Sequence, residues 1–315
     1  MMKPQDGYIQ YIVNPKSGAS SSKRMVSQFR DYLSEKGFDV RVQFTASLTH
    51  AGQLAAEAAA DEGCMLVAGA GGDGTLREVV QGLKGTGKLF LPVPCGTENL
   101  LANELGFDQH LQTLINAFEG NCIKPLDLGM INGCCFTSIV GFGFDGSVVD
   151  RISKIRTGHI NHLTYFWPIW RTFWEYSFPP VRVSVDGKEI FCNRGLVFVG
   201  NISHYAIGLG ICKKADYSDG LLDVCIFPCH DQAHLLAYAF KTALKTHLKS
   251  RSTIYVRAKT IQVSDCGQPV LCEIDGDPGP SLPADIHILP QAVRVIVPPG
   301  AKPAGIRTRF RRIID

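Results

Sequence analysis

The sequence predicts two domains, an N-terminal α/β domain with a parallel sheet and a C-terminal antiparallel β-sandwich. In residues 1–125, strand-like apolar runs alternate with helical segments, whereas short alternating strands dominate from Pro125 onward. The chain has 315 residues, of which 45% are hydrophobic, so it is long enough to form two cores. We expect domains at 1–125 and 126–299, followed by a basic tail at 300–315.

The N-terminal domain has four expected strands separated by helices. Apolar periodicity places the strands at 8–13, 38–44, 64–68 and 88–93, and the helices at 22–36, 50–60, 75–83 and 100–105. Such alternation forms parallel β-α-β units, in which ligands bind beyond the carboxyl ends of the strands. Polar residues that follow these ends are Asn14, Lys16, Thr45, the segment 71–75 and Thr97. We therefore expect one ligand site to collect them.

A glycine-rich segment, residues 69–75 (Gly-Ala-Gly-Gly-Asp-Gly-Thr), joins the third strand to its helix. Glycines permit positive φ and let several backbone N–H groups face one point, where the helix N-terminus adds its positive dipole end. This arrangement predicts a phosphate site. Asp73 would repel a phosphate unless a cation lies between them, so the segment indicates a metal–nucleotide complex. A turn that serves only chain reversal is the alternative interpretation.

Two other nucleotide-binding patterns are not supported by the sequence. Gly69, Gly71 and Gly74 satisfy G-x-G-x-x-G, but the dinucleotide pattern also requires an acidic residue about 20 positions later, and the stretch 88–97 contains none. The G-x-x-x-x-G-K-[ST] sequence of a P-loop does not occur.

The N-terminus and the cysteines bear on the cellular compartment. The first twenty residues lack an apolar segment after a basic start, and no run reaches the ~18 apolar residues of a membrane span. We therefore expect a cytoplasmic protein. Eleven cysteines are scattered without a C-x-x-C pair, which predicts neither a zinc site nor a disulfide framework.

Positive charge is concentrated in two segments, although the net charge is only +3. Residues 302–315 contain five basic residues and one acid, and residues 241–259 contain six basic residues and no acid. Such patches suit an anionic membrane surface or nucleotide phosphates, and a solvated face is the alternative. Because no aromatic-interleaved nucleic-acid motif accompanies them, we expect no nucleic-acid partner.

The C-terminal domain has short expected strands and two helices. The strands lie at 131–140, 181–185, 190–199, 221–227, 252–258, 261–264, 286–289 and 293–297. Asp186-Gly187 predicts a hairpin turn. The helices, at 159–178 and 231–249, are rich in aromatic and apolar residues, and we expect both to pack in the core because exposed aromatic side chains are costly.

Six ordered motifs extend over most of the chain, about residues 8–300. They are Asn14-Pro15-x-Ser17-Gly18, Gly71-Gly72-Asp73-Gly74-Thr75-x-x-Glu78-Val79, Pro94-x-Gly96-Thr97-x-Asn99-x-x-Ala102, Gly141-Phe142-Gly143-Phe144-Asp145, Asp219-Gly220-Leu221-Leu222-Asp223 and Asp275-Gly276-Asp277. In this order they resemble the diacylglycerol-kinase-like lipid kinases, which include bacterial diacylglycerol kinases and the sphingosine and ceramide kinases. The resemblance implies an ATP-binding α/β domain, a β-rich second domain, and transfer of the γ-phosphate of ATP to diacylglycerol or a related lipid alcohol.

The resemblance also implies roles for individual residues. ATP would be held by Asn14, Thr45, Gly71, Gly72, Asp73, Gly74, Thr75, Arg77 and Thr97, with Glu78 orienting the nucleotide. Asp73 would act with Mg²⁺, in agreement with the charge argument above. Asp216, Asp219 and the carbonyl of Leu221 match a family site for a structural Mg²⁺, and a surface turn with solvated acids is the alternative.

Two positions depart from the family pattern. Asn99 is followed by Leu100 where the family usually has aspartate. Asp277 stands where the family has a glutamate proposed as general base, and its side chain is one methylene shorter. Proton abstraction requires an approach of ~2.6–3.2 Å, so a shift of backbone or substrate would have to restore contact.

The sequence is also compatible with two other functions, and it predicts cofactors and partners for the lipid kinase. An NAD kinase also uses a Gly-Gly-Asp-Gly loop on a similar two-domain plan, and a non-catalytic lipid- or nucleotide-binding relative would accommodate Leu100 and Asp277. For an active lipid kinase we expect ATP and Mg²⁺ as cofactors. We also expect peripheral binding at the inner face of an anionic membrane through 159–178, 241–259 and 302–315. A homodimer is compatible with these expectations.

Overall fold

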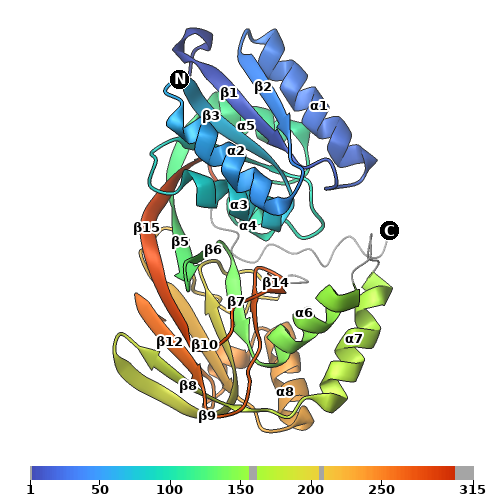
Figure 1. Cartoon of the computed structure of the whole chain (residues 1–315), viewed down its shortest axis with the longest axis vertical. Coiled ribbons are helices and arrows are strands. Elements are labelled where there is room, and N and C mark those ends of the chain that lie inside the picture. Colours follow the sequence, from blue (N-terminus) through green and yellow to red (C-terminus); the bar gives the residue numbers. More distant parts are fainter. Residues whose placement is uncertain (1, 156–161, 206–208, 302–315) are drawn as a thin grey trace. The chain divides into compact units, whose positions relative to one another are not determined.

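The computed structural model describes residues 2–155, 162–205 and 209–301 (Figure 1). The chain divides into two compact units, one formed by residues up to 125 together with those from 293 onward, the other by residues 126–292. Two strands, β5 (Cys122–Ile131) and β15 (Ala284–Val297), run from one unit into the other. The basic tail at 302–315 lies outside the described residues.

The first unit contains the predicted parallel sheet. Its strands are β1 (Tyr8–Val13), β2 (Asp39–Phe44), β3 (Cys64–Gly71) and β4 (Leu89–Pro94), in the order β2-β1-β3-β4. The end of β15 adds a parallel strand beside β4, with Arg294 and Val295 opposite Leu89 and Phe90. The helices are α1 (Ser20–Glu35), α2 (Leu48–Ala60), α3 (Asp73–Leu83), α4 (Leu100–Glu104) and α5 (Leu111–Gly120), after a short 3-10 turn at Pro4–Asp6. The sequence did not predict α5.

Helices cover both faces of this sheet, so its inner strand β1 is mostly apolar and is buried on both faces. Ile9, Tyr11 and Ile12 of β1 are fully buried although successive side chains of a strand point to opposite faces. The helix α1 packs with α5 and places Phe29 edge-on against Tyr11. The helices α2 and α3 pack together and contact β3.

The second unit is built from two antiparallel sheets that share β9 (Lys188–Gly200). One has the order β14-β13-β7-β9-β10-β11 and consists of β7 (Ile139–Phe142), β10 (Leu222–Pro228), β11 (Ile254–Ala258), β13 (Cys272–Ile274) and β14 (Asp277–Pro278) with β9. The other continues from β9 through β8 (Pro180–Val185) and β12 (Thr260–Asp265) to β15, with β5 and β6 (Cys134–Phe136) beside it. The predicted sandwich class is therefore confirmed.

Alternation along β9 divides the apolar side chains of this unit between two cores. Val197 and Val199 belong to the core that also contains residues of β8, β12 and β15. Leu196 and Phe198 belong to a second core on the other face, together with Leu235 of α8 (Gln232–Ala243). The sheet that contains β7 and β10 is thus covered by strands on one face and by helices on the other.

Several predicted elements of this unit differ in detail. The expected strand 131–140 is interrupted twice: Asn132 and Gly133, both with positive φ, form a turn between β5 and β6, and residues 137–138 separate β6 from β7. The expected strands 286–289 and 293–297 are one strand, β15. The helix α6 (Phe144–Ile155) was not predicted. Asp186-Gly187 forms the predicted turn, with φ of 47° and 81°, between β8 and β9.

One face of each of the two long helices packs in the core, as predicted, but other apolar side chains of both helices are exposed. On α7 (His162–Glu175), the exposed fractions of Trp167, Trp170 and Trp174 are 66%, 46% and 60%. Leu236 and Phe240 of α8, and Leu244 at its end, are also exposed. Apolar periodicity identified the helices, but each helix has a second apolar face that the described residues leave exposed.

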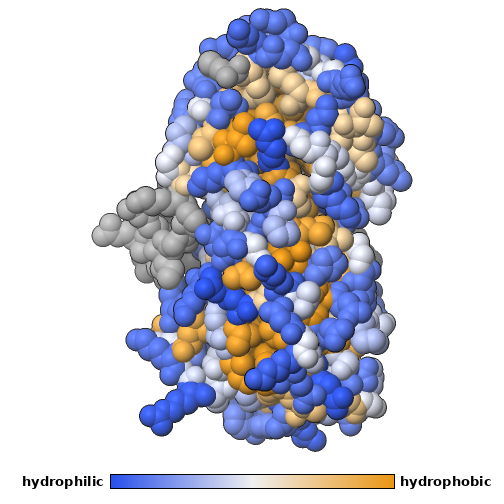
Figure 2. Space-filling view, turned by 90° about the vertical axis from the view of Figure 1, so that its left-hand side faces the viewer, coloured by the Kyte–Doolittle hydropathy of each residue, from blue (hydrophilic) through white to orange (hydrophobic). Residues whose placement is uncertain are grey.

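No helix in the described ranges combines the length and the apolar character needed to cross a membrane. The face drawn in Figure 2 is largely hydrophilic, with apolar residues gathered in patches between polar ones. Exposed large apolar side chains occur in both units, among them Phe44 and Leu48 in the first.

Candidate functional site

The carboxyl ends of the parallel strands bring three loops of the first unit together. Asn14 donates its N–H to the carbonyl of Ala70, and Cys95 donates to the carbonyl of Gly71, at 2.9 and 2.8 Å. Thr45 donates to the carbonyl of Val13 at 2.9 Å. The predicted residues at these strand ends therefore lie along one edge of the sheet, and their roles stay predictions.

The glycine-rich segment is shorter than the sequence suggested. β3 continues through Gly71 and α3 begins at Asp73, so only Gly72, the N-cap residue, lies between them. Gly72 has φ of −87°, and Gly71 and Gly74 lie within the strand and the helix, so the predicted positive φ is wrong.

Close approach explains why these positions are glycines. A Cβ on Gly71 would lie 2.4 Å from the Cβ of Thr75. A Cβ on Gly96 would lie 2.7 Å from the Cα of Gly72, so the loops after β3 and β4 are in backbone contact. A Cβ on Gly18 would lie 2.6 Å from the carbonyl oxygen of Cys95. The three loops are therefore packed so tightly that side chains are excluded between them.

Side-chain hydrogen bonds fix the polar groups of this site. Asn14 Nδ2 donates to Thr75 Oγ1 at 2.8 Å, which ties the loop after β1 to the first turn of α3. Asp73, also in that turn, accepts at Oδ1 from the N–H of Leu101 at 3.2 Å. The Asp73 carboxylate is an oxygen donor of the kind that Mg²⁺ takes, positioned among the N–H groups of a helix N-terminus.

Arg77 and Glu78 lie one turn further along α3. The Arg77 guanidinium is 3.7 Å from Glu78 Oε1, and both side chains are mostly buried. Because Arg77 follows Asp73 by four residues, the two lie on the same side of the helix.

The loop after β4 contains a residue whose role the sequence did not reveal. Asn99 has a left-handed conformation, with φ of 50°, and its side chain bonds to both the N–H and the carbonyl of Gly96. This closes the loop that carries Thr97, whose side chain is exposed, and starts α4 at Leu100. Leu100 itself replaces the usual aspartate, but the next N–H, of Leu101, reaches Asp73.

A pocket of about 250 Å³ borders the same loops on the α1 side of the sheet. Its lining is mostly apolar but includes two basic side chains and part of the loop after β1: Tyr11, Val13, Asn14, Pro15, Ser17, Lys23, Val26, Ser27, Arg30, Val42, Phe44, Ala70 and Cys95. Burial raises the pKa of the Cys95 thiol to about 12, so this group lines the pocket as a neutral side chain.

In the second unit, Asp277 follows a tight turn between β13 and β14. Asp275 and Gly276 have φ of 50° and 84°, and Asp277 pairs with Ile274 across the hairpin. Asp277 is partly exposed, as a candidate general base must be.

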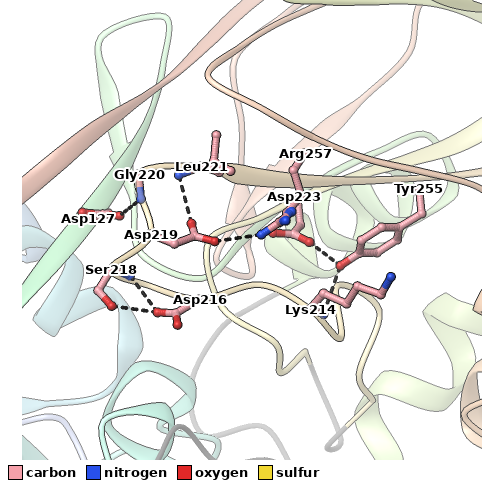
Figure 3. Close-up of polar contacts among 10 residues, drawn as sticks. All are labelled: Asp127, Lys214, Asp216, Ser218, Asp219, Gly220, Leu221, Asp223, Tyr255 and Arg257. Carbon is pink, nitrogen blue, oxygen red and sulfur yellow. Dashed lines mark hydrogen bonds and ion pairs between the residues drawn. The ribbon is translucent and has the colours of Figure 1, made fainter.

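The predicted cation ligands Asp216, Asp219 and Leu221 lie in one turn (Figure 3). Asp216 Oδ1 accepts from the N–H and the hydroxyl of Ser218, at 3.0 and 2.8 Å. Asp219 Oδ1 accepts from the N–H of Leu221 at 3.0 Å, and its Oδ2 pairs with Arg257 at 3.1 Å. The carboxylates therefore already stabilise the turn.

Further acidic groups lie beside this turn. Asp127 accepts from the N–H groups of Gly220 and Gln291, at 2.7 and 2.6 Å. Burial raises the pKa of Asp127 despite these two donors, and the charges of Asp219 and Asp216 add to the effect. Negative charge is therefore concentrated here.

The oxygen ligands suit a hard cation, but the site is not preformed. Within the described ranges, no three acidic, histidine or cysteine side chains are close enough together to hold a metal ion. A cation would rely on the carboxylates of Asp216 and Asp219 and the carbonyl of Leu221, and would compete with Arg257 for Asp219.

Comparisons with known proteins decide the family. Residues 9–131 match the model of the diacylglycerol kinase catalytic domain, and residues 138–297 match the YegS C-terminal NAD kinase beta sandwich-like domain. A diacylglycerol kinase of Mycobacterium tuberculosis is 31% identical over 300 residues, which cover 93% of this chain and 96% of the relative. This chain belongs to the diacylglycerol-kinase-like family of lipid kinases. The resemblance predicted from the motifs is confirmed.

Other relatives agree with this membership. A diacylglycerol kinase of Bacillus subtilis is 26% identical over 296 residues, covering 91% of this chain and 95% of the relative. A crystal structure of a diacylglycerol kinase from Bacillus anthracis has the same fold, with a TM-score of 0.68, 22% identity and coverage of 93% and 97%. As a member of this kinase family, the chain is a phosphotransferase related to lipid kinases.

Proposed function

We propose that this member of the family transfers the γ-phosphate of ATP to a hydroxyl of diacylglycerol or a related lipid alcohol. The observation that carries the proposal is the tight assembly of three loops around the N-terminus of α3, with Asp73 in its first turn. Phosphoryl transfer requires mainly positioning and charge stabilisation, and this assembly offers both.

The first unit would bind the nucleotide. N–H groups at the start of α3 would face the phosphates, and the Asn14–Thr75 hydrogen bond would hold the two flanking loops in register. The neighbouring pocket, with its apolar lining and its border at Asn14, suits a nucleoside base. Thr45, Arg77, Glu78 and Thr97 would complete the contacts that the family resemblance implies.

Charge at the phosphates requires a cation, and Asp73 would hold it. When bound together with ATP, Mg²⁺ offsets the negative charge that develops during transfer. The N–H of Leu101 fixes one oxygen of Asp73, so the carboxylate has a set orientation before any ligand binds. We also propose the turn of Asp216, Asp219 and Leu221 as a second, structural Mg²⁺ site, with Arg257 as the competing partner.

Asp277 would accept the proton of the lipid hydroxyl. Its place after a two-residue turn, where it pairs with Ile274 across the hairpin, gives the carboxylate a fixed backbone. Glu273, the only glutamate nearby in the sequence, cannot take this role because it is fully buried.

Two exposed helix faces support membrane binding, and we propose an anionic bilayer as their partner. All three tryptophans of the chain lie on α7 and are exposed. Leu236 and Phe240 of α8 and its C-cap residue Leu244 repeat every four residues, and the exposed Lys245 and Lys249 follow the helix. Gln232 of α8 donates to a carbonyl of α7 at 3.2 Å, so the helices adjoin in this unit (Figure 1). Aromatic and basic side chains together suit the interface of an anionic membrane.

Vesicle co-sedimentation tests the membrane partner. Wild-type protein should bind phosphatidylcholine vesicles that contain phosphatidylglycerol more strongly than phosphatidylcholine alone. The substitutions Trp174→Ser and Phe240→Ser should reduce binding, whereas Leu48→Ser, at an exposed apolar residue of the first unit, should not. Equal binding of all variants, or no preference for the anionic vesicles, would contradict the proposal.

An NAD kinase is the alternative that an observation favours, because the model matching residues 138–297 describes an NAD kinase-like sandwich. A non-catalytic relative is the other alternative. A transfer assay with γ-labelled ATP against diacylglycerol, sphingoid bases, other lipid alcohols and NAD separates all three. We expect label in a lipid; label in NAD supports the second function, and no transfer supports the third.

A further inference from the structure

Two acidic side chains converge inside the second unit. Glu273 lies in the middle of β13 and is fully buried, and it pairs with Gly141 of β7. Asp145 is the second residue of α6. A Cβ on Gly141 would lie 2.7 Å from Asp145 Oδ2 and 3.0 Å from Glu273 Oε1, so both carboxyl groups occupy the space that a side chain would fill.

Both carboxyl oxygens lie within 3.0 Å of the same point, and two carboxyl groups so close together in a buried setting cannot both be ionised. Burial, with the charge of Asp145 next in importance, raises the pKa of Glu273 well above its ordinary value. Burial also raises the pKa of Asp145, although a hydrogen bond from the Tyr205 hydroxyl opposes the rise. The pair therefore shares one proton.

The hydrogen-bond pattern assigns that proton to Glu273. Within the described residues, no donor reaches Glu273 Oε1, which is buried. Asp145 already accepts from Tyr205, so it acts as an acceptor. A proton on Oε1 that is donated to Asp145 gives this buried oxygen of Glu273 a partner.

The other oxygen of Glu273 reaches the turn that precedes Asp277. Oε2 accepts from the N–H of Gly276 at 2.7 Å. On its other side, the turn is held by Asp275, whose carboxylate accepts from the N–H groups of residues 137, 138 and 139 at 2.8–3.0 Å. The backbone from which Asp277 projects is therefore fixed at two points.

We propose that Glu273 in its protonated form is a positioning residue, which links Asp145 to the Gly276 N–H and so fixes the backbone that presents Asp277. The inference rests on the proposed function, in which Asp277 accepts the substrate proton. Of the two forms of the Glu273 side chain, only the neutral acid can donate to Asp145 and accept from Gly276 at once, and a glutamine amide can do the same. An ionised Glu273 would lose the donor and repel Asp145.

The test compares Glu273→Gln with Glu273→Met in the full-length protein. Glutamine keeps both hydrogen bonds, through Nε2 to Asp145 and Oε1 from Gly276, so kcat should stay within about twofold of wild type. Methionine fills similar volume without either bond, so kcat should fall about tenfold or more with little change in the KM for ATP, because a misplaced group slows only the chemical step. Loss of activity in Glu273→Gln, or normal kcat in Glu273→Met, would overturn the proposal.

Amide hydrogen exchange gives a readout that does not depend on turnover. The Gly276 N–H should be protected in wild type and Glu273→Gln, and should exchange faster in Glu273→Met. Equal protection in all three would contradict the proposed link. If Glu273→Met fails to fold, protection and kcat in Glu273→Gln still decide the outcome.

Asp277→Asn distinguishes this inference from the proposed function. If Asp277→Asn retains wild-type kcat, Asp277 is not the base and the function's mechanism fails. If Asp277→Asn is inactive while the kcat of Glu273→Met is normal, only the positioning role fails.

Discussion

Gly71 and Gly96 each face an atom that a side chain would displace, and this contact explains the glycine-rich motif better than backbone freedom does. Gly71 opposes Thr75, and Gly96 opposes Gly72. Sequence alone located the glycine-rich segment between a strand and a helix, with Asp73 at the start of the helix. The sequence could not show whether glycine is needed here for a positive φ or for close approach of the backbone. The close approach of Gly72 involves Gly96 in the loop after β4, which is distant in sequence.

Gly71→Ala tests the close approach. Because its Cβ would lie 2.4 Å from that of Thr75, the loop must shift, and we expect a loss of about 1–3 kcal/mol in the free energy of unfolding together with weaker MgATP binding. Gly72→Ala is the matched control, since its Cβ would lie 3.3 Å from the nearest atom and should cost less. Denaturant unfolding and calorimetric titration measure both. Equal effects of the two substitutions would contradict the packing account.

The acidic pair predicts that stability falls as pH rises. The folded chain keeps a proton on Glu273 that the unfolded chain releases above its ordinary pKa, 4.5, and Asp145 and Asp275 repel its ionised form. The unfolded state then binds fewer protons, so the free energy of unfolding decreases by up to about 1.4 kcal/mol per pH unit until the raised pKa is passed.

Glu273→Gln should remove the contribution of Glu273 to the pH dependence of the free energy of unfolding. Thermal melting from about pH 5 to about pH 8 should therefore show a flatter profile for the variant than for wild type. The comparison cancels the titration of groups that do not interact with Glu273. Parallel profiles would show that Glu273 is ionised in the folded chain.

At the scale of elements, the sequence predicted the helices α7 and α8 but not their exposed faces. Periodicity identifies an apolar stripe on a helix but does not show whether another element packs against it. In α8, for example, Leu235 is buried while its neighbour Leu236 is exposed. The helix α6 was missed because the glycine-rich motif that begins it, with Gly141 and Gly143, resembled strand and turn.

The turn with Asp216 and Asp219 makes an element-scale prediction about Mg²⁺. Arg257 pairs with Asp219 as an exposed ion pair, worth about 0–1 kcal/mol, so Arg257→Gln should cost little stability in chelator. If the turn binds Mg²⁺, removing the competitor should increase the rise in melting temperature that Mg²⁺ produces. Asp216→Asn should reduce that rise. If adding Mg²⁺ changes the melting temperature of neither wild type nor Arg257→Gln, the turn is not a Mg²⁺ site.

At the scale of the whole molecule, the sequence predicted two domains of the correct classes. Apolar periodicity also found a strand at 293–297, but it does not say which strand is the partner. In the structure, Val295 of β15 pairs with Phe90 of β4, so the end of this strand, from Val293 onward, belongs to the first unit. The identity of a partner strand depends on tertiary packing that local patterns do not record.

The proposed function depends on Asp73 and its cation more than on any other group. The most direct test is transfer of label from γ-labelled ATP to diacylglycerol in the presence of Mg²⁺, measured for wild type and Asp73→Asn. The melting temperatures of the two proteins should first be shown to be equal, so that a loss of transfer is not a loss of folding. We predict labelled lipid from wild type and none above background from Asp73→Asn. Near-normal transfer by Asp73→Asn, or the absence of labelled lipid with wild type, would contradict the account.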